Sequence, residues 1–152
     1  MSKTQQTFPL LYFRLFNAFE RDDIRSCLIG NNAKSILVLV AENQEISDAL
    51  LEFLSKILQA VNINLQQDIA LLQVTPESSF SFIQMARKFP VEKLLSFGLP
   101  AKQLGLHWRY TPYKPIEKIN RHFLFAERLS QIQNDRQRKL SLWKGLQEMF
   151  TS

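Results

Sequence analysis

The sequence has few of the residues that build metal centres, disulfides and phosphate-binding loops. Its 152 residues include one cysteine, two histidines and four glycines. A lone cysteine cannot form an internal disulfide, and two well-separated histidines with one cysteine show no spacing that is typical of metal ligands. Because the glycines are scattered, no glycine-rich loop joins a strand to a helix and cradles a phosphate. We therefore expect no metal and no cofactor.

Long apolar runs and catalytic motifs are also missing. No window approaches the roughly 18 consecutive apolar residues of a membrane-spanning helix. Residues 1–6 are polar, and Arg14 and Asn17 interrupt the apolar residues after them, which is unlike a signal peptide. A nucleophilic Gly-x-Ser-x-Gly turn is absent as well. These absences predict a cytoplasmic protein that does not contact a membrane and has no recognisable catalytic residue.

The sequence does contain enough apolar residues for one folded domain. Hydrophobic residues make up 45% of the chain and charged residues 22%, which predicts a single globular domain over residues 1–152. Within it we expect an N-terminal helical or partner-binding segment over residues 1–30 and an α/β body over residues 33–150. The net charge of +5 permits contact with nucleic acid or an acidic partner without requiring either.

The apolar run at residues 35–40 organises the predicted body. Five consecutive large aliphatic residues come after Ser35, and three of them are β-branched, a pattern that is typical of a strand buried on both faces. Leu37 and Leu39 should therefore be almost fully buried. A polar turn leads into an amphipathic segment over residues 45–61, which predicts a helix. Strand, short turn and helix form the first half of a crossover unit in a parallel sheet.

Apolar runs and helical patterns alternate along the rest of the chain. Three more strands are expected, at residues 68–74, 93–97 and 121–126. Further helices are expected from Ser78 or Ser79 to about Phe89, at residues 129–133, and from a cap at Asn134 or Asp135 to Phe150. Residues 99–119 show no regular pattern, and their three prolines exclude a long helix. The order predicts a three-layer α/β/α sandwich with a mainly parallel sheet of four strands.

The N-terminal segment is unusually rich in aromatic residues. Its apolar positions recur at helical spacing, and Pro9 suits the first turn of a helix. One interpretation is a helix that covers the sheet, and the other is an exposed apolar strip that binds a partner. In the second interpretation the partner-binding candidates are Phe8, Leu11, Tyr12, Phe13 and Phe16.

Two places outside that segment carry candidate functional residues. Glu42 comes directly after the first strand, but without a neighbouring histidine, aspartate or glycine we interpret it as a solvated turn residue. An aromatic and basic cluster occupies the irregular loop: Trp108, Arg109, Tyr110, Tyr113 and Lys114. Such a cluster suits a base-stacking platform or an interface hot spot, so Trp108 and Tyr113 are further partner-binding candidates. The alternative is that Trp108 and one tyrosine close the core.

The C-terminal region resembles a known protein family. Residues 123–150 resemble the C-terminal portion of psi-type subunits of bacterial DNA polymerase III, in which a strand ends in a small residue and a leucine-bearing turn precedes a helix. That helix carries a Lys/Arg–x–x–Leu–Trp–x–x–Leu pattern, which is matched here by Lys139, Leu142, Trp143 and Leu146. Residues 95–98 and 103–106 are similar to the middle region of psi-like proteins. The resemblance covers residues 35–150.

The resemblance implies a fold similar to that of uracil-DNA glycosylases without the glycosylase chemistry. Glycosylases of that fold have a glycine-rich, acid-containing loop after the first strand and a His-Pro-Ser-like loop after the last. This chain has Ala41–Glu42–Asn43–Gln44 and Ala126–Glu127–Arg128 at those places. Neither the water-activating acid in its motif nor the electrophilic histidine carries over, so the resemblance implies that the catalytic residues are absent.

The resemblance also implies a function. In the family an N-terminal segment engages clamp-loader subunits, and the globular body engages a chi subunit that reaches single-strand binding protein. By this resemblance the chain would be a non-catalytic DNA replication adaptor whose partners are clamp-loader subunits and a chi-like subunit, with indirect or weak DNA contact. The alternative is a divergent uracil-DNA glycosylase-like enzyme that binds or repairs DNA. Such an enzyme needs a concave polar cleft with convergent acid or histidine groups above the carboxyl ends of the strands, a region that an adaptor can fill.

Overall fold

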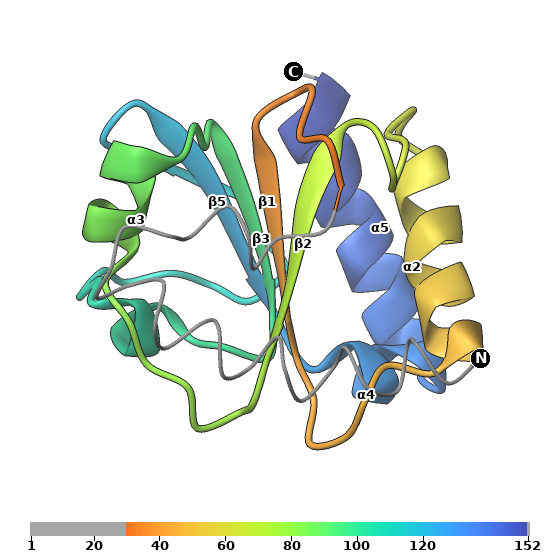
Figure 1. Cartoon of the computed structure of the whole chain (residues 1–152). Coiled ribbons are helices and arrows are strands. Elements are labelled where there is room, and N and C mark those ends of the chain that lie inside the picture. Colours follow the sequence, from red (N-terminus) through yellow and green to blue (C-terminus); the bar gives the residue numbers. More distant parts are fainter. Residues whose placement is uncertain (1–29, 152) are drawn as a thin grey trace.

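The structure, a computed structural model, describes residues 30–151, which form an α/β fold with a five-stranded, mostly parallel mixed sheet and four α-helices (Figure 1). In chain order the elements are β1 (Ile36–Ala41), α2 (Asp48–Gln59), β2 (Ile69–Val74), α3 (Phe82–Lys88), β3 (Lys93–Phe97), the 3-10 helix η2 (Ala101–Leu104), β4 (Ile116–Lys118), β5 (Arg121–Ala126), α4 (Leu129–Gln133) and α5 (Arg136–Thr151). From β1 to β3 strands and helices alternate as the sequence predicts, whereas β4 and β5 follow one another directly.

The sheet has the strand order β2-β1-β3-β5-β4. Parallel pairing joins β1 to both β2 and β3, and β3 to β5, whereas β4 runs antiparallel to β5. Every residue of β1 is at most 2% exposed. The prediction of a strand buried on both faces, with Leu37 and Leu39 fully covered, is therefore confirmed.

Helices lie on both faces of the sheet (Figure 1). α3 and η2 pack on one face and α2, α4 and α5 on the other, so each face has its own hydrophobic core. Successive β1 side chains enter opposite cores: Leu37 and Leu39 pack on the α3 side, whereas Val38 and Val40 pack on the α2 side. This alternation explains why the run contains no polar residue, because neither face of the strand meets water.

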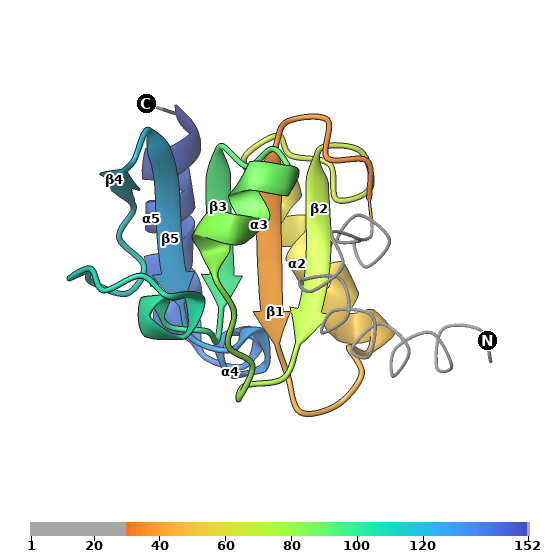
Figure 2. The same ribbon diagram turned by 60° about the vertical axis from the view of Figure 1, so that its left-hand side comes forward.

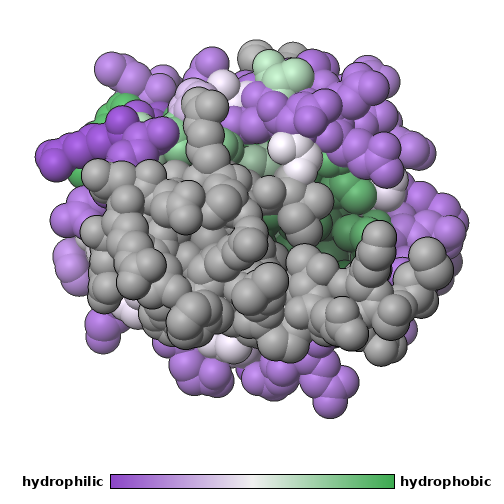
Figure 3. Space-filling view, in the orientation of Figure 1, coloured by the Kyte–Doolittle hydropathy of each residue, from purple (hydrophilic) through white to green (hydrophobic). Residues whose placement is uncertain are grey.

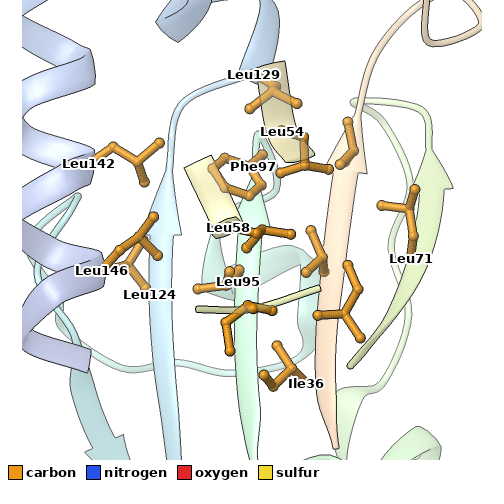
Figure 4. Packing of buried hydrophobic residues seen from close by; sticks show 14 of the residues in the cluster. Ile36, Leu54, Leu58, Leu71, Leu95, Phe97, Leu124, Leu129, Leu142 and Leu146 are labelled. Atoms are coloured by element: carbon orange, nitrogen blue, oxygen red, sulfur yellow. The ribbon is translucent and has the colours of Figure 1, made fainter. Parts of the chain in front are cut away.

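The core under α2 and α5 is drawn in Figure 4. Leu54 and Leu58 enter it from α2, and Leu142 and Leu146 enter it from α5, all at most 1% exposed. Each pair is spaced by four residues and so lies on a single face of its helix. The inward faces of α2 and α5 are thus fully used in packing against the sheet, which leaves their outward faces to the surface.

The sheet has one strand more than the sequence predicts. β4 lies in residues 99–119, where prolines exclude a long helix but do not exclude a short edge strand. Lys118 pairs with Arg121 across a turn in which Ile119 and Asn120 have φ of 46° and 59°. Two positive φ values are typical of a type I′ hairpin turn, a geometry that isoleucine rarely adopts. The residues of the turn therefore do not signal the hairpin, and the prediction of four strands is wrong.

Two helix starts also differ from the prediction. Ser81 caps α3, because its Oγ accepts the backbone N–H of Gln84 at 3.2 Å, so α3 begins later than a cap at Ser78 or Ser79 implies. Ser78 instead accepts the backbone N–H of Thr75 at 3.1 Å and stabilises the preceding turn. Several serines within a few residues compete for the cap, and only tertiary packing decides among them. α2 likewise begins at Asp48, after a cap at Ser47, rather than at residue 45.

The last helix begins where the sequence predicts. Asp135 Oδ1 accepts the backbone N–H of Arg138 at 3.1 Å, which is the hydrogen bond of a helix cap. None of the helices within residues 30–151 combines the length and the apolar character that crossing a membrane requires. On the face seen in Figure 3, hydrophilic residues cover much of the described surface, and hydrophobic residues are exposed in patches between them.

Candidate functional site

The carboxyl ends of β1 and β3 are where an α/β sheet of this topology normally binds a ligand. From β1 the sheet extends to β2, and from β3 it extends to β5 and β4, so the strand order reverses between β1 and β3. Ligands of open α/β sheets lie in the crevice at such a reversal. α4 lies at this end of the sheet (Figures 1 and 2). We call the residues that meet here, Glu42, Gly98, Arg128 and Ser130, the strand-end site.

Glu42 joins the end of β1 to α4. Its Oε1 accepts the hydroxyl hydrogen of Ser130 at 2.9 Å, and its Oε2 accepts the Ser130 backbone N–H at 3.0 Å. The residue is only 9% exposed. The interpretation of Glu42 as a solvated turn residue is therefore wrong, because α4 covers it and supplies the hydrogen bonds that a buried carboxylate requires.

The turn after β1 is fixed at its far end by Gln73 of β2. The Gln73 amide donates through Nε2 to the carbonyl oxygen of Gln44 at 2.9 Å and accepts through Oε1 from the backbone N–H of Ile46 at 3.4 Å. Gln73 is 5% exposed, so these hydrogen bonds lie largely out of water. Together with the Glu42–Ser130 pair they hold the turn in one conformation.

Gly98 and Arg128 meet in the crevice itself. Gly98 has a φ of +103°, and a Cβ added there would lie 3.0 Å from the Cβ of Ala41 and 3.1 Å from the Cγ of Arg128. The aliphatic part of Arg128 therefore packs directly on the Gly98 backbone, between the ends of β1 and β3. Only glycine combines this φ with so close an approach. Arg128 and Gly98 thus take up part of the crevice at the ends of the strands.

Two shallow hollows remain beside Arg128. One, of about 290 Å³, is lined among others by Tyr110, Phe125 and Gln131. The other, of about 330 Å³, is lined by the turn after β1 and by Ser130. Both are at the lower limit of the roughly 300–1,000 Å³ that is usual for ligand pockets. Within residues 30–151, no three histidine, cysteine, aspartate or glutamate side chains gather in a way that could hold a metal ion.

The aromatic loop does not form one platform. Trp108 packs edge-on against Phe123 with ring centroids 4.9 Å apart, and Tyr110 packs against Phe125 at 4.5 Å. Both rings belong to the core on the α3 side, whereas Tyr113 packs with the core on the α2 side. The structure thus agrees with the alternative in which Trp108 and a tyrosine close the core. It does not bring Trp108 and Tyr113 together.

Tyr113 attaches the loop to α5. Its hydroxyl donates to Glu127 Oε1 at 2.6 Å, and the same oxygen lies 2.7 Å from Arg138 Nε. Burial, with the neighbouring Glu127 carboxylate, raises the pKa of Tyr113 well above its ordinary value. A Cβ on Gly145 of α5 would collide with the Tyr113 carbonyl oxygen, so that glycine permits the close approach. Tyr113 is half-buried, and its polar atom is already bonded within the chain.

The remaining candidates lie beyond the part of the chain that the structure describes: Phe8, Leu11, Tyr12, Phe13 and Phe16. Conversely, sequence reasoning missed Arg128 and Ser130 as parts of the strand-end site. Ser130 is 88 positions from its partner Glu42, and no local pattern links the two. A glycine directly after the buried strand β3 was the only local signal of close packing at this place.

No protein-family model matches the chain, and no curated protein matches it. The strand-end site bears most on function, because a glycosylase and a non-catalytic adaptor make different demands on it.

Proposed function

We propose that the protein is a non-catalytic adaptor of DNA replication, which resembles the psi subunit of the DNA polymerase III clamp-loader complex and bridges clamp-loader subunits to another replication protein. An α/β fold with helices on both faces of a mostly parallel sheet is compatible with the uracil-DNA glycosylase-like, three-layer fold of that family. The N-terminal segment and a surface of the body would each bind one partner, and the protein would be cytoplasmic.

The closed strand-end site is the observation that supports this proposal best. Arg128 packs on Gly98 at the ends of the strands, and both carboxylate oxygens of Glu42 accept hydrogen bonds from Ser130. A glycosylase needs this place open for a flipped base and needs an acid that holds a water molecule. An adaptor needs neither, so closure of the site costs it no function.

A divergent DNA-repair enzyme is the alternative, and the hollow that contains Tyr110 and Arg128 is the feature in its favour. A ring and a guanidinium are groups that stack on bases and contact phosphates. This hollow offers no acid free of other bonds, because Glu127, the one carboxylate among its lining residues, is bonded to Tyr113 and Arg138. The other hollow is lined by two acids, Glu42 and Glu45, of which Glu42 would have to give up its hydrogen bonds to Ser130 before it could take part in chemistry.

Binding to a purified clamp-loader complex from the same organism tests the proposal. The full chain should elute with that complex in size-exclusion chromatography with light scattering. A variant that lacks residues 1–9 and carries Phe13→Ala should not bind the complex. A full-length Phe13→Leu variant should still bind it, because leucine retains apolar volume at that position. Incubation with uracil-containing DNA should release no base. Failure of the full chain to bind, or base release that Glu42→Gln abolishes, would overturn the adaptor proposal.

A further inference from the structure

An apolar groove of about 300 Å³ lies on the outer surface between α2 and α5. Its walls come from both helices and are formed chiefly by Phe53, Ile57, Leu142 and Trp143. Leu142 is at the bottom of the groove, since it is 1% exposed and belongs to the core, whereas Trp143 is 37% exposed at the surface. The groove thus connects the hydrophobic core with an exposed aromatic ring, the residue type that most often anchors a protein interface.

The rim of the groove is basic. Lys56 and Lys139 line it on either side, and none of its lining residues is acidic. The ammonium of Lys139 lies 5.8 Å from the centre of the Phe53 ring, while the ammonium of Lys56 lies 3.8 Å from Glu52. Because the Lys56 and Glu52 side chains are 73% and 71% exposed, that ion pair is weak and leaves Lys56 available to another carboxylate.

The dimensions of the groove suit an α-helix. On α2 the lining runs from Phe53 to Ala60, a span of about 10 Å at the helical rise of roughly 1.5 Å per residue. Large side chains spaced by four residues along a partner helix lie about 6 Å apart in that direction, so two of them fit the groove. The walls are mostly apolar, whereas cofactor sites usually combine apolar walls with several precisely placed polar groups.

We propose that the α2–α5 groove binds an amphipathic helix of a partner protein, with two large apolar side chains in the groove and acidic residues against Lys56 and Lys139. The inference rests on the proposed adaptor function and assigns one of its partners to a surface of the body. The charge of the rim distinguishes an acidic partner helix from a second copy of this chain as the bound molecule. A second copy of this chain, which has a net charge of +5, would bring its own lysines against the basic rim, whereas an acidic helix complements it.

Selection from a displayed library of helical peptides with random charge tests the proposal on the full chain. Peptides retained by the wild type should be acidic and should carry large apolar residues at positions i and i+4. A representative peptide should bind the Trp143→Ala variant at least about 30-fold more weakly. Lys139→Glu, which leaves the apolar walls in place, should weaken binding about tenfold. Two exposed positions of α5 outside the groove serve as matched controls: Leu140→Ala and Lys144→Glu should bind as the wild type does.

The indole N–H signals locate the bound peptide. In a nuclear magnetic resonance titration the Trp143 indole should shift on addition of peptide, while the Trp108 indole, on the other face of the sheet, stays in place. Neutral or basic selected peptides, a shift of Trp143 with protein concentration alone, or an equal shift with a single-stranded oligonucleotide would each overturn the proposal. If the wild-type chain binds the peptide but not the clamp-loader complex, the adaptor function is overturned and the groove is still a site that binds a helix.

Discussion

The strand-end site and the α2–α5 groove differ in a way that reverses the usual plan of an α/β protein. At the strand-end site, where such folds normally bind ligands, Glu42 is bonded to Ser130 and Arg128 packs on Gly98. The groove, on the outside of two helices that already cover the sheet, keeps apolar walls and an exposed Trp143. The two places therefore differ in chemistry rather than in size: polar groups bonded within the chain characterise the strand-end site, whereas apolar walls and an exposed ring, which we propose bind a partner, characterise the groove.

The largest effect should come from the residue that the groove shares with the core. Leu142→Ala should lower the free energy of unfolding by about 2–5 kcal/mol, because a buried leucine is lost and a cavity remains. Leu140→Ala, at a position of the same helix that is 46% exposed, should change it by less than about 0.5 kcal/mol. Urea denaturation of both variants measures the difference. Equal losses would show that the base of the groove is not part of the core.

Gly98→Ala should destabilise the protein by crowding the strand-end site. The methyl group would meet Ala41 and Arg128 at 3.0 and 3.1 Å with φ at +103°, so we expect a loss of about 1–3 kcal/mol. Gly105→Ala is the control, because its φ is also positive, at +74°, but its nearest neighbour would be 3.9 Å away. Thermal unfolding of the two variants separates crowding from backbone strain. A smaller loss at Gly98 than at Gly105 would contradict the packed crevice.

Glu42→Ala should destabilise the protein by about 1–2 kcal/mol, because the backbone N–H of Ser130 loses its acceptor. Glu42→Gln keeps an oxygen for that N–H and should retain most of the stability. Chemical denaturation at neutral pH gives both values. If Glu42→Ala were neutral, the carboxylate would be solvated after all, and the strand-end site would be more open than we describe.

Much of the fold can be predicted from the sequence, and the reason is burial. β3, β5 and α4 have the predicted bounds, because each strand has a buried apolar centre, Leu94–Leu95 in β3 and Phe123–Phe125 in β5, and the α4 residues Leu129 and Ile132 pack inward. The sequence does not predict β4, because this strand has three residues, none of them buried, and ends in a turn that isoleucine rarely forms. Short edge strands are specified by their neighbour rather than by their own composition.

The candidate site was less predictable, because it is made by contacts between distant residues. Nothing near Glu42 indicates that Ser130 will cover it, and the charge rule that favours solvated acids fails when a helix supplies hydrogen bonds. The loop that contains Trp108 has the composition of a binding loop, yet the Trp108 ring packs on Phe123. The groove likewise depends on the spacing of α2 and α5, which no periodicity within either helix determines.

The smallest effect on stability should come from the rim of the groove. Lys139→Glu should change the free energy of unfolding by less than about 1 kcal/mol, since it removes only an exposed contact between an ammonium and the Phe53 ring. Its effect should be confined to binding of an acidic helix. Differential scanning calorimetry checks the stability. A loss comparable to that of Leu142→Ala would mean that the rim is structural rather than available to a partner.

Hydrogen–deuterium exchange of the full chain, alone and with the clamp-loader complex, tests the central claim most directly. Slower exchange should mark where the partner lies, because bound surfaces and the backbone beneath them open less often. We predict that binding slows exchange outside the strand-end site and leaves the amides of residues 41–45, Gly98 and Leu99 unchanged. Protection confined to those amides, or a complex that does not form, would contradict the account.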